Sequence, residues 1–275
     1  MSSPGNQFFT FVYGNSEIAI FALLAVFLFF FLLFLILSRR HKLWPLRELA
    51  PYQHIRGAIG RAAELGKGVH FSPGSGDLAQ GVHPVETLAG LTIGEAVARQ
   101  AAHNGARLVT TTNGPVAYAV ADNAMARGYA NVGRLADYNP EDTRFITQGQ
   151  SDSLPYLVGA ADVVEHEDTA TNIAVGYFGS EYLLLGETAA RRGANQIVGS
   201  SEASAIPLML TTADPEQVLI GEEIFAGGAY LQQRASHVAS LNAQDVVRIM
   251  LIIVIIIGVI LANLYPDALN FIFSR

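Results

Sequence analysis

The chain has 275 residues, no cysteine, and 17 Lys and Arg against 24 Asp and Glu, a net charge of −7. Without cysteine the chain forms no disulfide bonds. Between residues 43 and 245 there are 12 basic and 22 acidic residues. This region would repel phosphate backbones, so nucleic acid is not expected as a partner.

The first predicted element is a membrane-spanning helix. Residues 18–37 carry no polar side chain, and twenty helical residues reach about 30 Å, the thickness of a hydrocarbon core. Residues 1–17 contain no Lys or Arg, so the segment lacks the basic start of a cleaved signal peptide. We expect an extracytoplasmic tail over 1–17 and a retained transmembrane helix over 18–38.

Basic residues follow this helix directly. Arg39, Arg40 and Lys42 lie on one side of it and no basic residue lies on the other, so the positive-inside rule places the following region in the cytoplasm. Residues 52–65 read as a helix that ends at Gly66. The sequence thus predicts a juxtamembrane helical segment over 39–66 and an inner or plasma membrane location.

From residue 69 onward, short β-branched runs alternate with helical stretches. The expected strands are 69–72, 108–112, 145–148, 173–178, 197–200 and 206–211. The expected helices are 85–103, 116–127, 154–164, 181–192 and 216–231. This alternation predicts a cytoplasmic α/β domain over 67–231, with an open, largely parallel sheet and helices on both faces.

Two stretches of this domain are similar to each other. Residues 94–99 and 186–191 share the pattern Gly-Glu-x-x-Ala-Arg, and each leads through a glycine to an expected strand. The similarity over 94–112 and 186–201 fits a duplicated helix–turn–strand unit. It equally fits chance in an Ala- and Gly-rich chain, because helix ends favour glycine.

A second apolar segment lies near the end of the chain. Residues 232–245 are expected to form a connecting helix, and residues 249–262 carry no polar side chain. Fourteen apolar residues could also form a buried core helix, but Arg248 and Tyr265 suit the two interfaces of a membrane. We expect a transmembrane helix over 246–264 and an extracytoplasmic tail over 265–275. Neither apolar run holds an ionisable residue, so both helices read as anchors.

Small and hydroxylated residues follow most of the expected strands. In an open parallel sheet these loops share the carboxyl edge, where ligands bind and helix N-termini point. The candidate contacts for a small anionic ligand are Ser75, Gly76, Thr111, Asn113, Ser151, Ser180 and Ser201. The same residue types also cap helices and form turns, so a purely structural role is the alternative.

No motif points to catalysis or to a metal. Residues 149–153 resemble a nucleophile elbow, but Ser153 stands where that turn requires glycine. Residues 165–168, Glu-His-Glu-Asp, point in different directions and have no second ligand cluster. Glu181, Glu187 and Glu202 could supply acid–base chemistry, but nothing in their spacing selects them. No catalytic residue, metal or cofactor is expected.

Three motifs carry a resemblance to a known family. They are Ser-Pro-Gly-Ser-Gly-Asp at 72–77, Thr-Thr-Thr-Asn-Gly-Pro at 110–115 and Gly-Ser-Glu-Tyr-Leu-Leu-Leu-Gly-Glu at 179–187. With the two apolar segments, they resemble an uncharacterised bacterial family of membrane-anchored proteins that carry a domain of unknown function. The resemblance spans most of the central domain and implies no activity and no site residue.

The surface composition favours a protein that contacts other proteins. Charged residues make up 34 of the 203 residues from 43 to 245, near 17%, against about 25% in typical domains. A sparsely charged surface is typical of protein interfaces, although a GC-rich genome would also favour Arg, Ala and Gly. We expect a membrane-anchored scaffold whose partners are further copies of itself (a homo-oligomer), the lipid bilayer and, in a larger complex, other membrane proteins. The alternatives are a cytoplasmic-face sensor of a small anion and a membrane-tethered enzyme.

Overall fold

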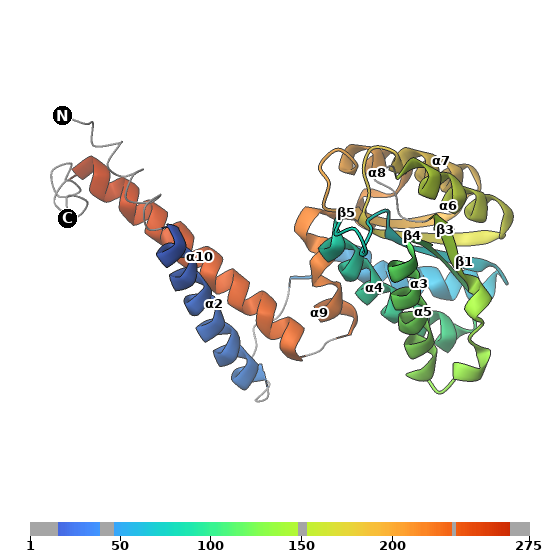
Figure 1. Ribbon diagram of the computed structural model, residues 1–275, viewed down its shortest axis with the longest axis horizontal. Coiled ribbons are helices and arrows are strands. Elements are labelled where there is room, and N and C mark those ends of the chain that lie inside the picture. The colour runs from blue at the N-terminus through green and yellow to red at the C-terminus, as the bar shows by residue number, and fades with distance from the viewer. Residues whose placement is uncertain (1–15, 39–46, 148–152, 233–234, 265–275) are drawn as a thin grey trace. The chain divides into compact units, whose positions relative to one another are not determined.

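The computed structural model describes residues 16–38, 47–147, 153–232 and 235–264 and divides into two units (Figure 1). One unit is Arg47–Gln233, and the other joins Met1–Leu46 to Arg234–Arg275. The expected tails, residues 39–46 and Ser151 lie outside the described residues, except that residues 16 and 17 already belong to helix α2.

The unit Arg47–Gln233 is built on a six-stranded sheet in which all neighbouring strands are parallel. The strands are β1 (Gly68–Gly74), β2 (Leu108–Asn113), β3 (Thr143–Thr147), β4 (Thr169–Tyr177), β5 (Asn195–Ser200) and β6 (Val218–Ile220). Their order in space is β3-β2-β1-β4-β5-β6. The expected α/β class is confirmed. Strand β2 is wholly buried, as in sheets that are covered on both faces.

Helices cover the two faces of the sheet (Figure 1). One face carries α3 (Ala50–Glu64), α4 (Pro84–Asn104) and α5 (Pro115–Ala130), and the other carries α6 (Leu154–His166), α7 (Tyr182–Arg191) and α8 (Ile206–Thr212). Five of them, α3 to α6 and α8, have Pro in their first two positions, where its missing N–H needs no partner. Helix α3, expected as a juxtamembrane segment, packs on α4 and β4 and so belongs to the domain.

The two similar stretches fold alike. Helix α4 ends at Gly105, with φ 73°, before β2, and α7 is followed by Gly193, with φ 71°, before β5. Both turns use the left-handed conformation that glycine adopts without strain. Each stretch is therefore a helix, a glycine turn and a parallel strand.

Two expected elements are wrong. Residues 206–211 were expected as a strand but lie in α8, because Pro207 begins a helix readily and lacks the N–H that a central strand needs. The expected helix 216–231 is instead η3 (Pro215–Gln217), β6, η4 (Gly221–Ala226) and α9 (Gly227–Leu231). The apolar run Val218–Ile220 pairs with β5, and Gly221, with φ 61°, ends it.

The two ends of the domain lie together. The rings of Tyr52 in α3 and Tyr230 in α9 stack with their centroids 5.3 Å apart. The Tyr52 hydroxyl donates to the Glu223 carbonyl oxygen at 2.8 Å, and the Tyr230 hydroxyl donates to that of Arg47. The chain therefore enters and leaves this unit at one place.

In the described part of the other unit, two helices lie side by side, α2 (Ser16–Ser38) and α10 (Ala235–Leu264). Phe34 of α2 is buried with Ala239 and Ala243 of α10. Helix α10 runs without a break through residues 235–245, expected as a connecting helix, into the second apolar segment. Among the described residues, Ser236–Ile257 is the one helical segment long and apolar enough to cross a membrane, and the apolar stretch of α2, Leu24–Leu37, is shorter.

Candidate functional site

The strand order reverses between β1 and β4. From β1 the chain adds β2 and β3 on one side, and it then returns to place β4, β5 and β6 on the other. Dinucleotide-binding α/β domains use this same order, and ligands of open α/β sheets bind outside the carboxyl ends of the strands at the reversal. The candidate site is therefore the carboxyl edge around β1 and β4.

The loop after β1 is tied to the neighbouring strands. The Ser75 N–H donates to the Tyr177 carbonyl oxygen at 2.8 Å, and Asn113 Nδ2 donates to the Ser75 carbonyl oxygen at 2.6 Å. Thr147 Oγ1 donates to Asn113 Oδ1 at 2.5 Å. The structure thus brings the candidate residues Ser75 and Asn113 together, with the Asn113 amide already engaged by the protein.

The same loop carries a signal that the sequence analysis missed. Residues 74–79, Gly-Ser-Gly-Asp-Leu-Ala, match the G-x-G-x-x-A form of the dinucleotide fingerprint. However, α4 begins only at Pro84, so its N-terminus does not follow the glycines directly. A Cβ on Gly76 would lie 3.0 Å from the carbonyl oxygens of both Val82 and His83. The space left by this glycine is therefore filled by its own loop.

The other candidate residues differ in their surroundings. Thr111 is fully buried, and its hydroxyl contacts Tyr156 at 3.2 Å inside the domain. Ser180 is exposed after β4, whereas Ser201, after β5, donates to a Glu86 carboxylate oxygen at 3.4 Å. Thr111 is therefore turned away from the loops, and anion binding by the remaining residues stays a prediction.

Tyr177, at the end of β4, lies at the centre of this edge. The His83 ring stacks on the Tyr177 ring at 3.4 Å between centroids, with 6° between the planes. His83 holds this position with φ 49°, a left-handed conformation that is strained for a residue other than glycine. Burial raises the pKa of Tyr177, and the nearby charges of Glu202, Glu181 and Glu86 raise it further.

These three carboxylates lack arginine and lysine partners within the described residues. Glu181 accepts from the Ser153 hydroxyl and from the Gly179 N–H at 3.2 Å, and the ionic contact of Glu86 is with His83 Nδ1 at 3.8 Å. Within the described part of the chain, none of the three pairs with Lys or Arg. The sequence could not select them, because their proximity depends on the order of the strands.

A row of buried polar side chains crosses the sheet beneath α6 and α7. His70 Nδ1 contacts Asn172 Oδ1 at 2.7 Å, and His70 Nε2 contacts Thr111 Oγ1 at 3.0 Å. The Tyr156 hydroxyl contacts the Ser72 hydroxyl at 2.6 Å and donates to the Thr111 carbonyl oxygen at 3.1 Å. Desolvation by burial lowers the pKa of His70 to about 4. His70 is thus neutral at physiological pH.

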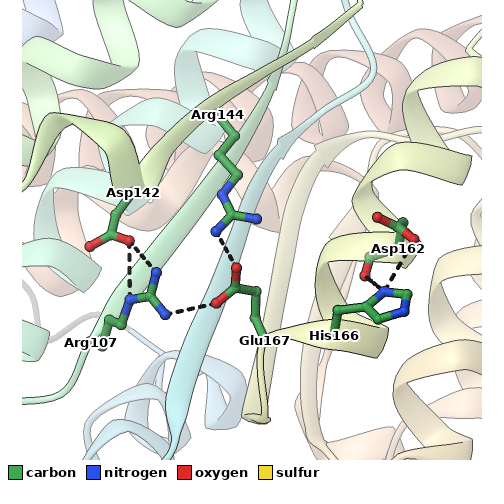
Figure 2. A network of polar contacts seen from close by, with 6 residues as sticks. All are labelled: Arg107, Asp142, Arg144, Asp162, His166 and Glu167. Carbon is green, nitrogen blue, oxygen red and sulfur yellow. Dashed lines mark hydrogen bonds and ion pairs between the residues drawn. The ribbon is translucent and has the colours of Figure 1, made fainter.

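Figure 2 shows a network of charged residues at the opposite, amino edge of the sheet. Arg107 donates to Asp142 Oδ1 at 2.6 Å and to Glu167 Oε2 at 2.7 Å, and Arg144 donates to Glu167 Oε1. The hydrogen bond from Arg144 is the first cause that lowers the pKa of Glu167. Carboxylates at this edge therefore have arginine partners, unlike those around Tyr177.

The segment considered for metal binding lies in the same region. Asp168 pairs with Lys67 at 2.9 Å and Glu165 with Arg192 at 3.9 Å. In the described ranges, no group of three or more His, Asp or Glu residues could hold a metal ion. Two cavities, of about 300 and 290 Å³, are both lined by Lys67 and Asp168, so they lie away from the candidate ligand residues.

Comparison with known proteins identifies a family for this chain but no activity. A family model described as a domain of unknown function matches residues 7–273. No curated protein and no solved structure matches the chain.

Proposed function

We propose that this chain, which belongs to the DUF6754 family, a domain of unknown function that covers residues 7–273, is a membrane-anchored scaffold. In this proposal α2 and α10 are two anchors in an inner or plasma membrane, and the α/β domain lies in the cytoplasm. The domain assembles with further copies of itself on the membrane surface.

The exposed apolar surface of α10 carries the membrane part of the proposal. Several of its isoleucine side chains are 50–64% exposed: Ile249, Ile252, Ile255 and Ile257. Exposure of such apolar side chains to water is unfavourable, whereas contact with lipid is not. Helix α2 contributes Phe21 and further exposed aliphatic and aromatic side chains. Two adjacent helices with such surfaces suit a bilayer.

Cysteine labelling tests this arrangement, since the natural chain has no cysteine. A membrane-impermeant maleimide should label Ser3→Cys and Ser274→Cys in spheroplasts. It should reach Ser204→Cys, which is exposed on the domain, only after the membrane is opened. If Ser204→Cys were the one position labelled in intact spheroplasts, the domain would lie outside the cytoplasm and the proposed topology would be wrong. Recovery of the protein in the soluble fraction would contradict the membrane proposal.

The edge strand β3 supports self-assembly. β3 lies at one end of the sheet, so one side of it has no neighbouring strand in the sheet. Phe145 on β3 is 43% exposed, and Val116 of α5 and Val158 of α6 are exposed as well. An edge strand flanked by apolar side chains is a ready site for pairing with another chain. Confinement of the copies to one membrane also lowers the entropy cost of association.

Changing Phe145 tests the role of this edge. In lipid nanodiscs the wild-type protein should have the mass of an oligomer, and Phe145→Glu should shift it toward the monomer because a buried interface does not accommodate an unpaired carboxylate. Leu65→Glu is the matched control, since Leu65 is 66% exposed and lies between α3 and β1, and β1 is separated from β3 by another strand. A monomeric wild type would defeat the scaffold proposal. An oligomer that Phe145→Glu leaves intact would place the contact elsewhere.

A further inference from the structure

Exposed apolar side chains flank the three carboxylates around Tyr177. Val85 and Leu88, in the first turns of α4, are 60% and 49% exposed, and Leu183 and Leu184, at the start of α7, are each 38% exposed. We call these four residues together with Glu86, Glu181 and Glu202 the switch-point surface. It combines a negative centre with apolar flanks on both faces of the sheet.

The contacts of Tyr177 show that the parts of this surface belong together. Its ring stacks against His83, the residue just before α4. The negative charges of Glu86 in α4, Glu181 just before α7 and Glu202 after β5 raise the pKa of Tyr177. The hydrogen bond from Ser201 to Glu86 also links the end of β5 to α4. The N-terminal ends of α4 and α7 therefore frame one region.

The charge of this region selects the kind of partner. At the amino edge, Asp142, Glu167 and Asp168 are each paired with Arg or Lys, whereas the carboxylates of the switch-point surface have no such partner among the described residues. Half-buried carboxylates gain most from a cation that binds next to them. Two like surfaces meeting face to face would repel each other, and an anionic lipid surface would be repelled as well.

We infer that the switch-point surface binds a polypeptide segment of a partner protein that carries Lys or Arg between apolar side chains. The basic residues would face Glu86 and Glu202, and the apolar ones would cover Val85 and Leu88 on one side and Leu183 and Leu184 on the other. A small amine would supply the positive charge but no apolar side chains to cover these four residues. This inference goes beyond self-assembly through β3, and it does not require that assembly.

Binding of a probe peptide tests the inference. The full-length protein in phosphatidylcholine nanodiscs is titrated against a fluorescent amphipathic peptide of Lys and Leu, with empty nanodiscs as background, and fluorescence anisotropy is measured. The Lys–Leu peptide should bind the protein, and the matching Glu–Leu peptide should not. Glu86→Gln combined with Glu202→Gln should weaken binding at least tenfold, and Leu183→Ser combined with Leu184→Ser should weaken it as well.

The matched control removes the same charge at the other edge. Glu165→Gln combined with Glu64→Gln, both at exposed carboxylates that precede the amino ends of β4 and β1, should leave the affinity within twofold of wild type. Equal weakening by both Gln pairs would show general attraction to an acidic protein and overturn the inference. Unchanged binding after Glu86→Gln and Glu202→Gln would overturn it too. A cooperative thermal unfolding transition shows that each variant is folded. If the protein with both Glu86→Gln and Glu202→Gln is not folded, the variant with Glu202→Gln alone is used in its place.

Discussion

Gly176→Ala should lower the free energy of unfolding by more than about 3 kcal/mol. Gly176 lies near the end of β4, and a Cβ there would lie 2.5 Å from the Pro73 carbonyl carbon and closer still to its oxygen. Both contacts are with the backbone of β1, so no side chain can turn aside. For a domain of this size the midpoint of thermal unfolding should fall by about 6–12 °C, as measured by circular dichroism of the full chain in mild detergent.

Gly60→Ala is the control for this substitution. Gly60 lies inside helix α3, and a Cβ there would meet nothing within 4 Å. Because Ala favours the helix over Gly, this change should stabilise the protein by about 0.5–1 kcal/mol. A Gly176→Ala protein as stable as wild type would show that β1 and β4 are not as closely packed as described.

Acidification from pH 7 to pH 4 should remove about 3 kcal/mol of stability through His70 alone. Burial lowers the pKa of His70 to about 4 in the folded protein, whereas its pKa in the unfolded chain is about 6.5. The unfolded chain therefore binds this proton first as the pH falls. The contribution is complete above pH 6.5, is lost between pH 6.5 and 4, and is constant below that range.

Urea unfolding at a series of pH values measures this effect. Between pH 6 and 5 the free energy of unfolding should fall by about 1.2 kcal/mol. His70→Gln keeps a side chain that can hydrogen-bond to Asn172 or Thr111 but does not titrate, so its slope in this range should be close to zero. A wild-type slope near zero, or the same slope in both proteins, would mean that His70 is not kept neutral by its surroundings.

The parallel sheet could be predicted because each buried strand is a short apolar or β-branched run followed by a helical stretch. Residues 206–211 were wrongly expected to form a strand because most of them are apolar. Pro207, which favours the start of a helix, was the better indicator. β6 was missed because three residues, Val218–Ile220, form too short a run to stand out. Its pairing with β5 provides the stabilisation that the local sequence lacks.

The site was harder to predict than the fold. The carboxyl edge could be anticipated from the parallel strands, but the position of β4 beside β1 could not. This neighbourhood places both Glu86 and Glu181 near Tyr177. Thr111 was expected as a ligand contact, but it is buried against Tyr156, and the sequence of the strand did not show which of its faces would be covered. The buried polar row around His70 and Ser72 was not expected, because its partners Asn172 and Tyr156 lie far away in the sequence.

The meeting of the domain's two ends, at Tyr52 and Tyr230, has an evolutionary consequence. A domain whose ends lie together can be inserted between two helices as a cassette, because its size does not change the gap that the flanking chain must bridge. Insertions in its loops, or its exchange for another domain, would leave the junction at Arg47 and Gln233 unchanged. The helix pair and the α/β domain are therefore free to diverge at different rates within one gene.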